Sequence, residues 1–104
     1  MRSLETLEEF KDAVGSERLS VIDFWAGFCQ PCKAIAPYYA ALAEEFPLVD
    51  FYKVDVEGST ANAIAQSERV RAMPTFLFYK GGVRLDEVVG ADKARLRAAV
   101  LRLQ

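Results

Sequence analysis

The sequence contains no histidine. This absence excludes Ser-His and Cys-His nucleophilic pairs, histidine metal ligands, and histidine as a general acid or base. Proton transfer would therefore have to run through carboxylates, thiols, lysines or water. Cysteine is almost as scarce, because Cys29 and Cys32 are the only two. A zinc site typically takes four Cys or His ligands, and this chain offers only two, so we predict no bound metal.

A strong charge of one sign and a long apolar run are also missing. The net charge is −2, from 13 basic and 15 acidic residues, so no positive excess favours nucleic acid or an anionic membrane as a partner. No apolar run approaches the roughly 18 residues of a membrane span, and the acidic N-terminal segment does not resemble a signal peptide. With one closely spaced thiol pair, these features favour a reducing compartment, and we expect a cytoplasmic protein.

The 104 residues have the length of one domain, and we expect residues 1–104 to form it. Helical patterns cover residues 7–14, 33–46, 60–67 and the segment from Asp92, and strand patterns cover 19–25, 49–56, 75–79 and 83–89. Thr6 and Glu9 predict a capping box, Pro37 a bend in the second helix, and Gly81-Gly82 a hairpin turn. This order predicts an α/β fold with a central mixed sheet and helices on both faces.

The two cysteines form the motif Cys29-Gln30-Pro31-Cys32, between a strand pattern and a helical pattern. A disulfide between such close neighbours constrains only a small loop and adds little stability, so reversible redox chemistry is the favoured interpretation. We expect Cys29 to be exposed at a helix N-terminus, where free N–H groups and the helix dipole favour a thiolate. Cys32 would lie one turn further on, less exposed, and would resolve a mixed disulfide. On the motif alone, a metal site and two incidental buried residues remain as alternatives.

Three other positions have an ordinary and a functional interpretation. Asp23 interrupts an apolar strand pattern. It is either an exposed or hydrogen-bonded structural carboxylate, or a buried one whose raised pKa lets it take a proton from Cys32. Lys53 lies in a later strand pattern and, on pattern alone, is a solvated lysine. The Met73-Pro74 bond precedes a strand, and such bonds are mostly trans.

Several segments together resemble the thioredoxin family. Residues 21–37 closely resemble its active-site segment, 51–56 its third strand, and 71–76 its cis-proline loop. Residues 80–82 and 89–91 resemble its hairpin and the loop before its last helix. The resemblance covers essentially the whole chain in order. It implies the thioredoxin fold and a protein-disulfide reductase that works by dithiol–disulfide exchange in cell redox homeostasis.

The resemblance also implies roles for individual residues. Cys29 would be the nucleophile, Cys32 the resolving thiol, and Asp23 the buried group that handles the proton. Lys53 would lie near Asp23 and moderate its pKa, and the bond before Pro74 would be cis. The expected substrate-binding residues, which would form an apolar rim with a backbone edge, are Trp25, Phe28, Met73, Pro74, Gly90 and Ala91.

The active-site motif departs from the family pattern. The usual Trp-Cys-Gly-Pro-Cys is Phe28-Cys29-Gln30-Pro31-Cys32 here. Phe28 keeps an aromatic ring but lacks an indole N–H, while Pro31 rigidifies the turn. Gln30 replaces glycine, and its side chain could hydrogen-bond the thiolate or crowd the substrate. Residues between the cysteines help to set the redox balance, so two alternatives accompany the reductase: a more oxidising disulfide oxidase or isomerase, and a thioredoxin-like binding or chaperone module.

The resemblance finally implies how the protein is supplied with electrons. It would hold no bound cofactor and would receive electrons from NADPH through thioredoxin reductase. Its other partners would be client proteins that contain disulfides. We expect a monomer that binds neither nucleic acid nor a membrane.

Overall fold

The computed structural model describes residues 1–104, and it contains a five-stranded sheet with four helices. The sheet order is β1-β3-β2-β4-β5; the β1–β3 and β3–β2 pairs are parallel, and the β2–β4 and β4–β5 pairs are antiparallel. The strands are β1 (Arg2–Ser3), β2 (Ser20–Trp25), β3 (Asp50–Asp55), β4 (Thr75–Lys80) and β5 (Val83–Val89). The helices are α1 (Leu7–Val14), α2 (Gln30–Glu45), α3 (Asn62–Ser67) and α4 (Lys93–Leu103). The predicted α/β architecture with a mixed sheet is confirmed.

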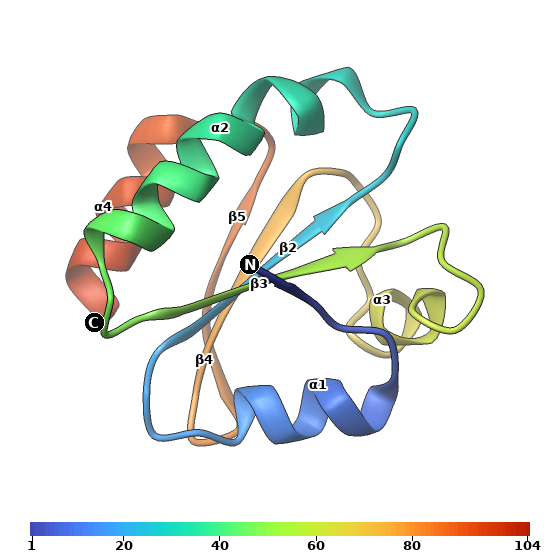
Figure 1. Ribbon diagram of the computed structural model, residues 1–104, viewed down its shortest axis with the longest axis horizontal. Helices are drawn as coiled ribbons and strands as arrows, with labels where there is room; N and C mark the ends of the chain where they lie inside the picture. The colour runs from blue at the N-terminus through green and yellow to red at the C-terminus, as the bar shows by residue number, and fades with distance from the viewer.

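The helices cover both faces of the sheet, as predicted (Figure 1). Successive residues of a strand point to opposite faces, so each central strand supplies both layers of core. In β2, Val21 joins the core cluster that holds residues of α2 and α4, whereas Ile22 joins the cluster that holds residues of α1 and α3. The central strands are therefore apolar on both faces, and a polar side chain on one of them needs a specific explanation.

The predicted elements agree with the structure apart from their ends. The capping box of Thr6 and Glu9 is present, and positive φ values at Gly81 and Gly82 form the hairpin turn. Helix α2 begins at Gln30 with Cys29 as its N-cap, which confirms the expected place of Cys29 at a helix N-terminus; the amphipathic pattern alone marked the helix only from residue 33. Pro37 lies inside α2, and the bend there stays a prediction. The sequence did not reveal β1, because two exposed residues carry no periodic pattern.

The topology brings three distant segments to one edge of the sheet. Parallel strands β2 and β3 end at this edge, and antiparallel β4 begins there, with Phe24 opposite Thr75. Strand β5 runs antiparallel to β4, so its last residue, Val89, also lies opposite Thr75. The loop after β2, the loop before β4 and the loop after β5 must therefore meet. These loops carry the cysteine motif, Met73-Pro74 and Gly90.

Candidate active site

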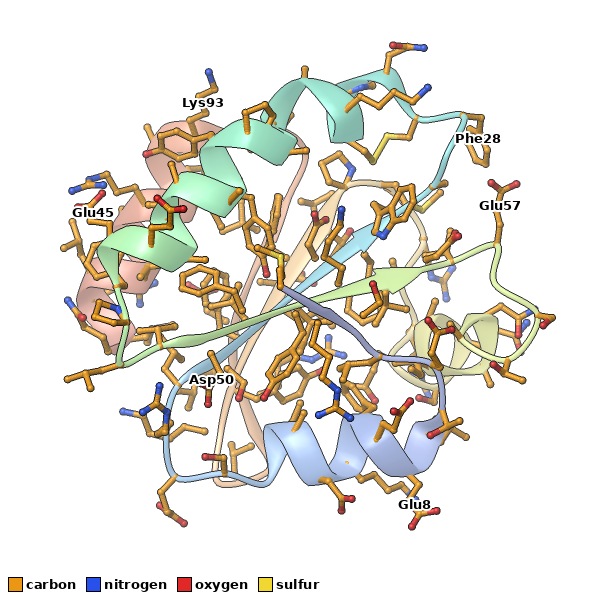
Figure 2. The ribbon with its side chains drawn as sticks, viewed as in Figure 1. Glu8, Phe28, Glu45, Asp50, Glu57 and Lys93 are labelled. Atoms are coloured by element: carbon orange, nitrogen blue, oxygen red, sulfur yellow. A yellow bond between two sulfur atoms is a disulfide. The ribbon has the colours of Figure 1, made fainter.

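Cys29 and Cys32 form a disulfide at the N-terminus of α2, close to Phe28 on the outside of the preceding loop (Figure 2). The Sγ atom of Cys29 accepts a hydrogen bond from the backbone N–H of Cys32, with 3.2 Å between the two atoms. This N–H is one of the donors that the start of a helix leaves without a backbone partner. It would stabilise a thiolate on Cys29 after reduction, as would the positive end of the helix dipole.

The two cysteine residues differ less in exposure than the sequence suggested. Cys29 is 7% exposed and Cys32 is 3% exposed. The expected order is confirmed, but the prediction that Cys29 is exposed is wrong for the disulfide form. The cause is close packing, because Trp25, Val56 and Met73 lie against the cluster that contains both cysteines. The carbonyl oxygen of Met73 is 3.5 Å from Sγ of Cys29.

Asp23 is buried below the disulfide, so the exposed-carboxylate interpretation is wrong. Its Oδ1 atom is buried and has no hydrogen-bond partner. Burial raises the pKa of Asp23 from 3.8 to about 7, although the nearby positive charge of Lys53 acts to lower it. A carboxyl group with a pKa near neutrality can both accept and release a proton at physiological pH.

A small hollow connects this carboxyl group with the dithiol. Its volume is about 100 Å³, and its walls include Asp23, Cys32, Trp25 and Lys53. This is more than the space that one water molecule needs, and the walls offer polar partners for it. The hollow thus provides room for a water that could relay a proton between Cys32 and Asp23.

Lys53 lies opposite Asp23 in the register of β3 and β2, so the two side chains share a face of the sheet. Its Nζ atom lies 4.7 Å from the centre of the Trp25 ring, within range of a cation–π interaction. Lys53 is half-buried. The interpretation as a fully solvated lysine is therefore wrong, and its charge lies in the same pocket as the buried carboxyl group.

The loop before β4 forms the other side of the site. The Met73-Pro74 peptide bond is cis, so the default expectation of a trans bond is wrong and the expectation from the resemblance is confirmed. The N–H of Gly90 donates a hydrogen bond to the carbonyl oxygen of Pro74 at 2.8 Å, which fastens the loop after β5 to this segment. Thr75 Oγ1 donates to the carbonyl oxygen of Ala72 at 2.6 Å.

The remaining predicted site residues differ in exposure. Phe28 is 66% exposed and Ala91 is exposed, whereas Trp25, Met73 and Gly90 are half-buried. Pro74 is buried, so its side chain does not belong to an exposed rim. Pro31 is the second residue of α2 and is exposed. Gln30 is also exposed, and its side chain makes no hydrogen bond. It therefore does not hydrogen-bond the Cys29 sulfur in the disulfide form, and the hydrogen-bonding alternative finds no support there.

Comparison with known proteins agrees with this geometry. The Thioredoxin family model matches residues 3–102. The chain belongs to the thioredoxin family. It is 43% identical over 99 residues to thioredoxin of Malassezia sympodialis, covering 93% of this chain and 92% of that protein. It is 42% identical over 96 residues to thioredoxin-1 of Saccharomyces cerevisiae, covering 92% and 91%. The X-ray structure of Fasciola hepatica thioredoxin superposes with a TM-score of 0.95 at 40% identity, and all of both chains is covered.

Membership in the thioredoxin family fixes the general activity. The protein is a protein-disulfide oxidoreductase of the reductase type, with the close cysteine pair as its redox centre. The alternative of a binding or chaperone module is not favoured. No group of three or more His, Cys, Asp or Glu side chains is arranged to hold a metal ion. None of the helices combines the length and apolar character required to cross a membrane.

The sequence did not point to every residue around this thioredoxin site. Val89 is 47% exposed at the end of β5, beside the loop that carries Gly90. Its place at the end of a strand pattern was the available signal. Lys33 and Ala36 line the hollow next to Asp23 because they lie on the first turns of α2 that face β2. Nothing in their residue types marks this position.

Replacing Lys53 with methionine is expected to raise the pKa of Asp23 further above its ordinary value. The positive charge of Lys53 favours the ionised carboxylate, and methionine has a similar length without that charge. A ¹³C NMR titration of the Asp23 carboxyl carbon measures the change. Lys11→Met on α1 is the control, because Lys11 is exposed on a helix that packs on the opposite face of the sheet. An unchanged or lower pKa in Lys53→Met would show that Lys53 does not act on Asp23.

Proposed function

We propose that Cys29 attacks the disulfide of a client protein and that Cys32 then resolves the mixed disulfide. In the first step, a Cys29–client S–S bond forms while the client S–S bond breaks, and one client thiolate leaves. In the second step, the Cys32 thiolate attacks Sγ of Cys29, the second client thiol is released, and the Cys29–Cys32 disulfide forms. Two electrons pass from the dithiol to the client. The observation that carries this assignment is the hydrogen bond from Cys32 N–H to Cys29 Sγ at the start of α2.

Asp23 is the proposed acceptor for the Cys32 proton. Only the thiolate is nucleophilic, so Cys32 must lose its proton before the second step. The raised pKa of Asp23 and the hollow that it shares with Cys32 support a transfer through water. In this proposal Lys53 supports catalysis by moderating that pKa, while Pro31 and Gln30 shape the turn between the cysteines.

The client would bind across the junction of the three loops. An extended segment can pair with the free backbone edge at Met73, a mode of recognition that tolerates many sequences. The carbonyl oxygen of Met73 lies 3.5 Å from the Cys29 sulfur, so this pairing would position the client disulfide for attack. The proposed contact surface is completed by the apolar rim of Trp25, Phe28, Gly90 and Ala91, while the buried Pro74 would act by holding the backbone of Met73 in place.

The oxidised protein would be recharged with electrons from NADPH through thioredoxin reductase. Family membership supports this route, and we propose no cofactor bound to the chain itself. We further propose that the chain acts as a single domain and a monomer in the cytoplasm, where thiols are kept reduced. Its partners would be the reductase and disulfide-containing clients rather than nucleic acid or a membrane.

A coupled assay tests the proposal. The protein is mixed with insulin, NADPH and a thioredoxin reductase, and NADPH consumption is followed. The unmodified protein is expected to turn over insulin disulfides, whereas Cys29→Ser is expected to reduce the rate to that without the protein. Lys11→Met serves as the matched surface variant and should retain full activity. Full activity of Cys29→Ser would refute the proposed nucleophile.

A further inference from the structure

A second hollow lies directly beside the cis-proline loop, on the side of α3 and β5. Its volume is about 230 Å³. It is bounded by the segment between α3 and β4, through Arg69, Arg71 and Ala72, and by β5, through Arg84 and Val89. We call this hollow the arginine pocket. None of the roles proposed above uses it.

The arginine pocket contains positive charge that the protein leaves unpaired. Five of the eight arginines form ion pairs, and Arg84 is one of these, bound to Glu68. Arg69, Arg71 and Arg95 form none, and their side chains donate no hydrogen bonds. Two of these three line the same pocket. Besides Arg69 and Arg71, the only charged residue that lines this pocket without an ion pair is Glu87.

Arg69 is held in an unusual backbone conformation. It follows Glu68, the C-cap of α3, and has φ = 59°, in the left-handed region. Glycine is the usual residue there, and other residues are disfavoured by roughly 1–2 kcal/mol. The chain thus has an arginine at the rim of this pocket, at a position where the backbone conformation favours glycine.

The pocket is close to the chemistry. Ala72 lines it, and the next residue, Met73, has its carbonyl oxygen 3.5 Å from the Cys29 sulfur. Neighbouring Cα atoms are about 3.8 Å apart, and an extended chain advances about 3.3 Å per residue. Arg71 and Arg69 lie two and four residues before Met73. A client segment that pairs with Met73 and extends alongside this stretch would therefore bring residues about two to four positions from its cysteine over the pocket.

We propose that the arginine pocket selects client disulfides whose cysteine has an aspartate or glutamate about two to four residues away. Guanidinium groups bind carboxylates through paired hydrogen bonds, and charge complementarity at an interface mainly raises the association rate. Arg69 and Arg71 would supply these contacts, and Glu87 would oppose them. The proposal rests on the disulfide exchange at Cys29. It runs against the net charge of −2, which by itself would disfavour acidic clients.

Symmetric peptide disulfides provide the probe. Each peptide has one cysteine and either glutamate or glutamine at a position two, three or four residues from it, on either side. Reduced protein is mixed with the peptide disulfide in a stopped-flow instrument, and Trp25 fluorescence follows formation of the Cys29–Cys32 disulfide. For at least one position, we expect the glutamate peptide to react about threefold faster than its glutamine counterpart at low ionic strength, as for an exposed ion pair. The ratio should fall toward one at about 0.5 M salt.

Variants locate the source of the preference. The double variant Arg69→Gln/Arg71→Gln should lose the preference while it still reduces the glutamine peptides at the original rate. Lys11→Gln is a control for a lost positive charge and should retain the preference, and Glu87→Gln should increase it. Equal rates for glutamate and glutamine peptides at every position, or a preference that survives in the double variant, would overturn the proposal. Failure to reduce any peptide would instead contradict the exchange chemistry itself.

Discussion

Replacing Cys32 with serine is expected to convert this reductase into a covalent trap for its clients. Cys29 keeps its position at the start of α2 and its hydrogen bond from the backbone N–H of residue 32, so it can still attack a disulfide. The serine hydroxyl cannot replace the Cys32 thiolate as the group that attacks the mixed disulfide. Turnover should therefore fall to the uncatalysed rate, while the Cys29–client adduct accumulates.

The adduct is measured by non-reducing electrophoresis and intact-protein mass spectrometry after incubation with insulin. Dithiothreitol should release the client, which identifies the bond as a disulfide. Cys29→Ser is the matched control and should form no adduct, because the attacking sulfur is absent. If Cys29→Ser accumulated the adduct and Cys32→Ser did not, the two roles would be reversed.

Burial of Asp23 is expected to make the protein less stable as pH rises, and replacement of Asp23 with asparagine is expected to remove this loss. The pKa of Asp23 is about 7 in the folded protein, against an ordinary value of 3.8. Below 3.8 the carboxyl group is protonated in both states and pH has no effect on stability through it. Between 3.8 and 7 only the unfolded chain ionises, so stability falls as pH rises; above 7 the penalty is complete. A difference of about three pH units corresponds to roughly 4 kcal/mol.

Urea denaturation at pH 4 and pH 8 should therefore give the free energy of unfolding of the disulfide form of the unmodified protein and of Asp23→Asn. From pH 4 to pH 8, the free energy of unfolding of the variant is expected to rise by roughly 4 kcal/mol relative to that of the unmodified protein. Asp12→Asn, an exposed position on α1, is the control and should show no such shift. Parallel pH profiles for the protein and Asp23→Asn would show that the carboxylate is not destabilised by burial.

The same variant should also slow catalysis, because asparagine cannot accept the Cys32 proton. Loss of a general base typically costs about 100-fold or more, and the effect should appear in release of the client rather than in formation of the adduct. Rapid-quench measurement of the mixed disulfide separates the two steps. An Asp23→Asn variant that resolves the adduct at the original rate would remove Asp23 from the mechanism.

Much of this site could be predicted because its parts have local signals. The spacing of Cys29 and Cys32 between a strand pattern and a helical pattern indicates a redox pair at a helix N-terminus, and the structure places Cys29 as the N-cap. Asp23 stands out because a carboxylate in an apolar strand is unusual. Its burial depends on α2 covering that face of the sheet, which residue pattern alone did not decide.

Features that depend on distant contacts were not predictable in this way. The low exposure of Cys29 arises from Met73 and Trp25, which topology brings together. Strand β1 has no pattern of its own and forms because its backbone pairs with β3. The arginine pocket joins Arg69 and Arg71 with Val89 from another strand, so their unpaired charge acquires a location only in the folded chain.

The reduction potential of the Cys29–Cys32 pair decides whether the protein acts as a disulfide reductase. The protein is equilibrated in dithiothreitol buffers of defined potential, and Trp25 fluorescence reports the reduced fraction because this ring packs against the dithiol. We expect a strongly reducing value, near the roughly −270 mV that is established for thioredoxin. A value near −180 mV or higher, typical of disulfide isomerases and oxidases, would mean that the Phe28 and Gln30 replacements have shifted the protein toward oxidation, and would contradict its assignment as a reductase.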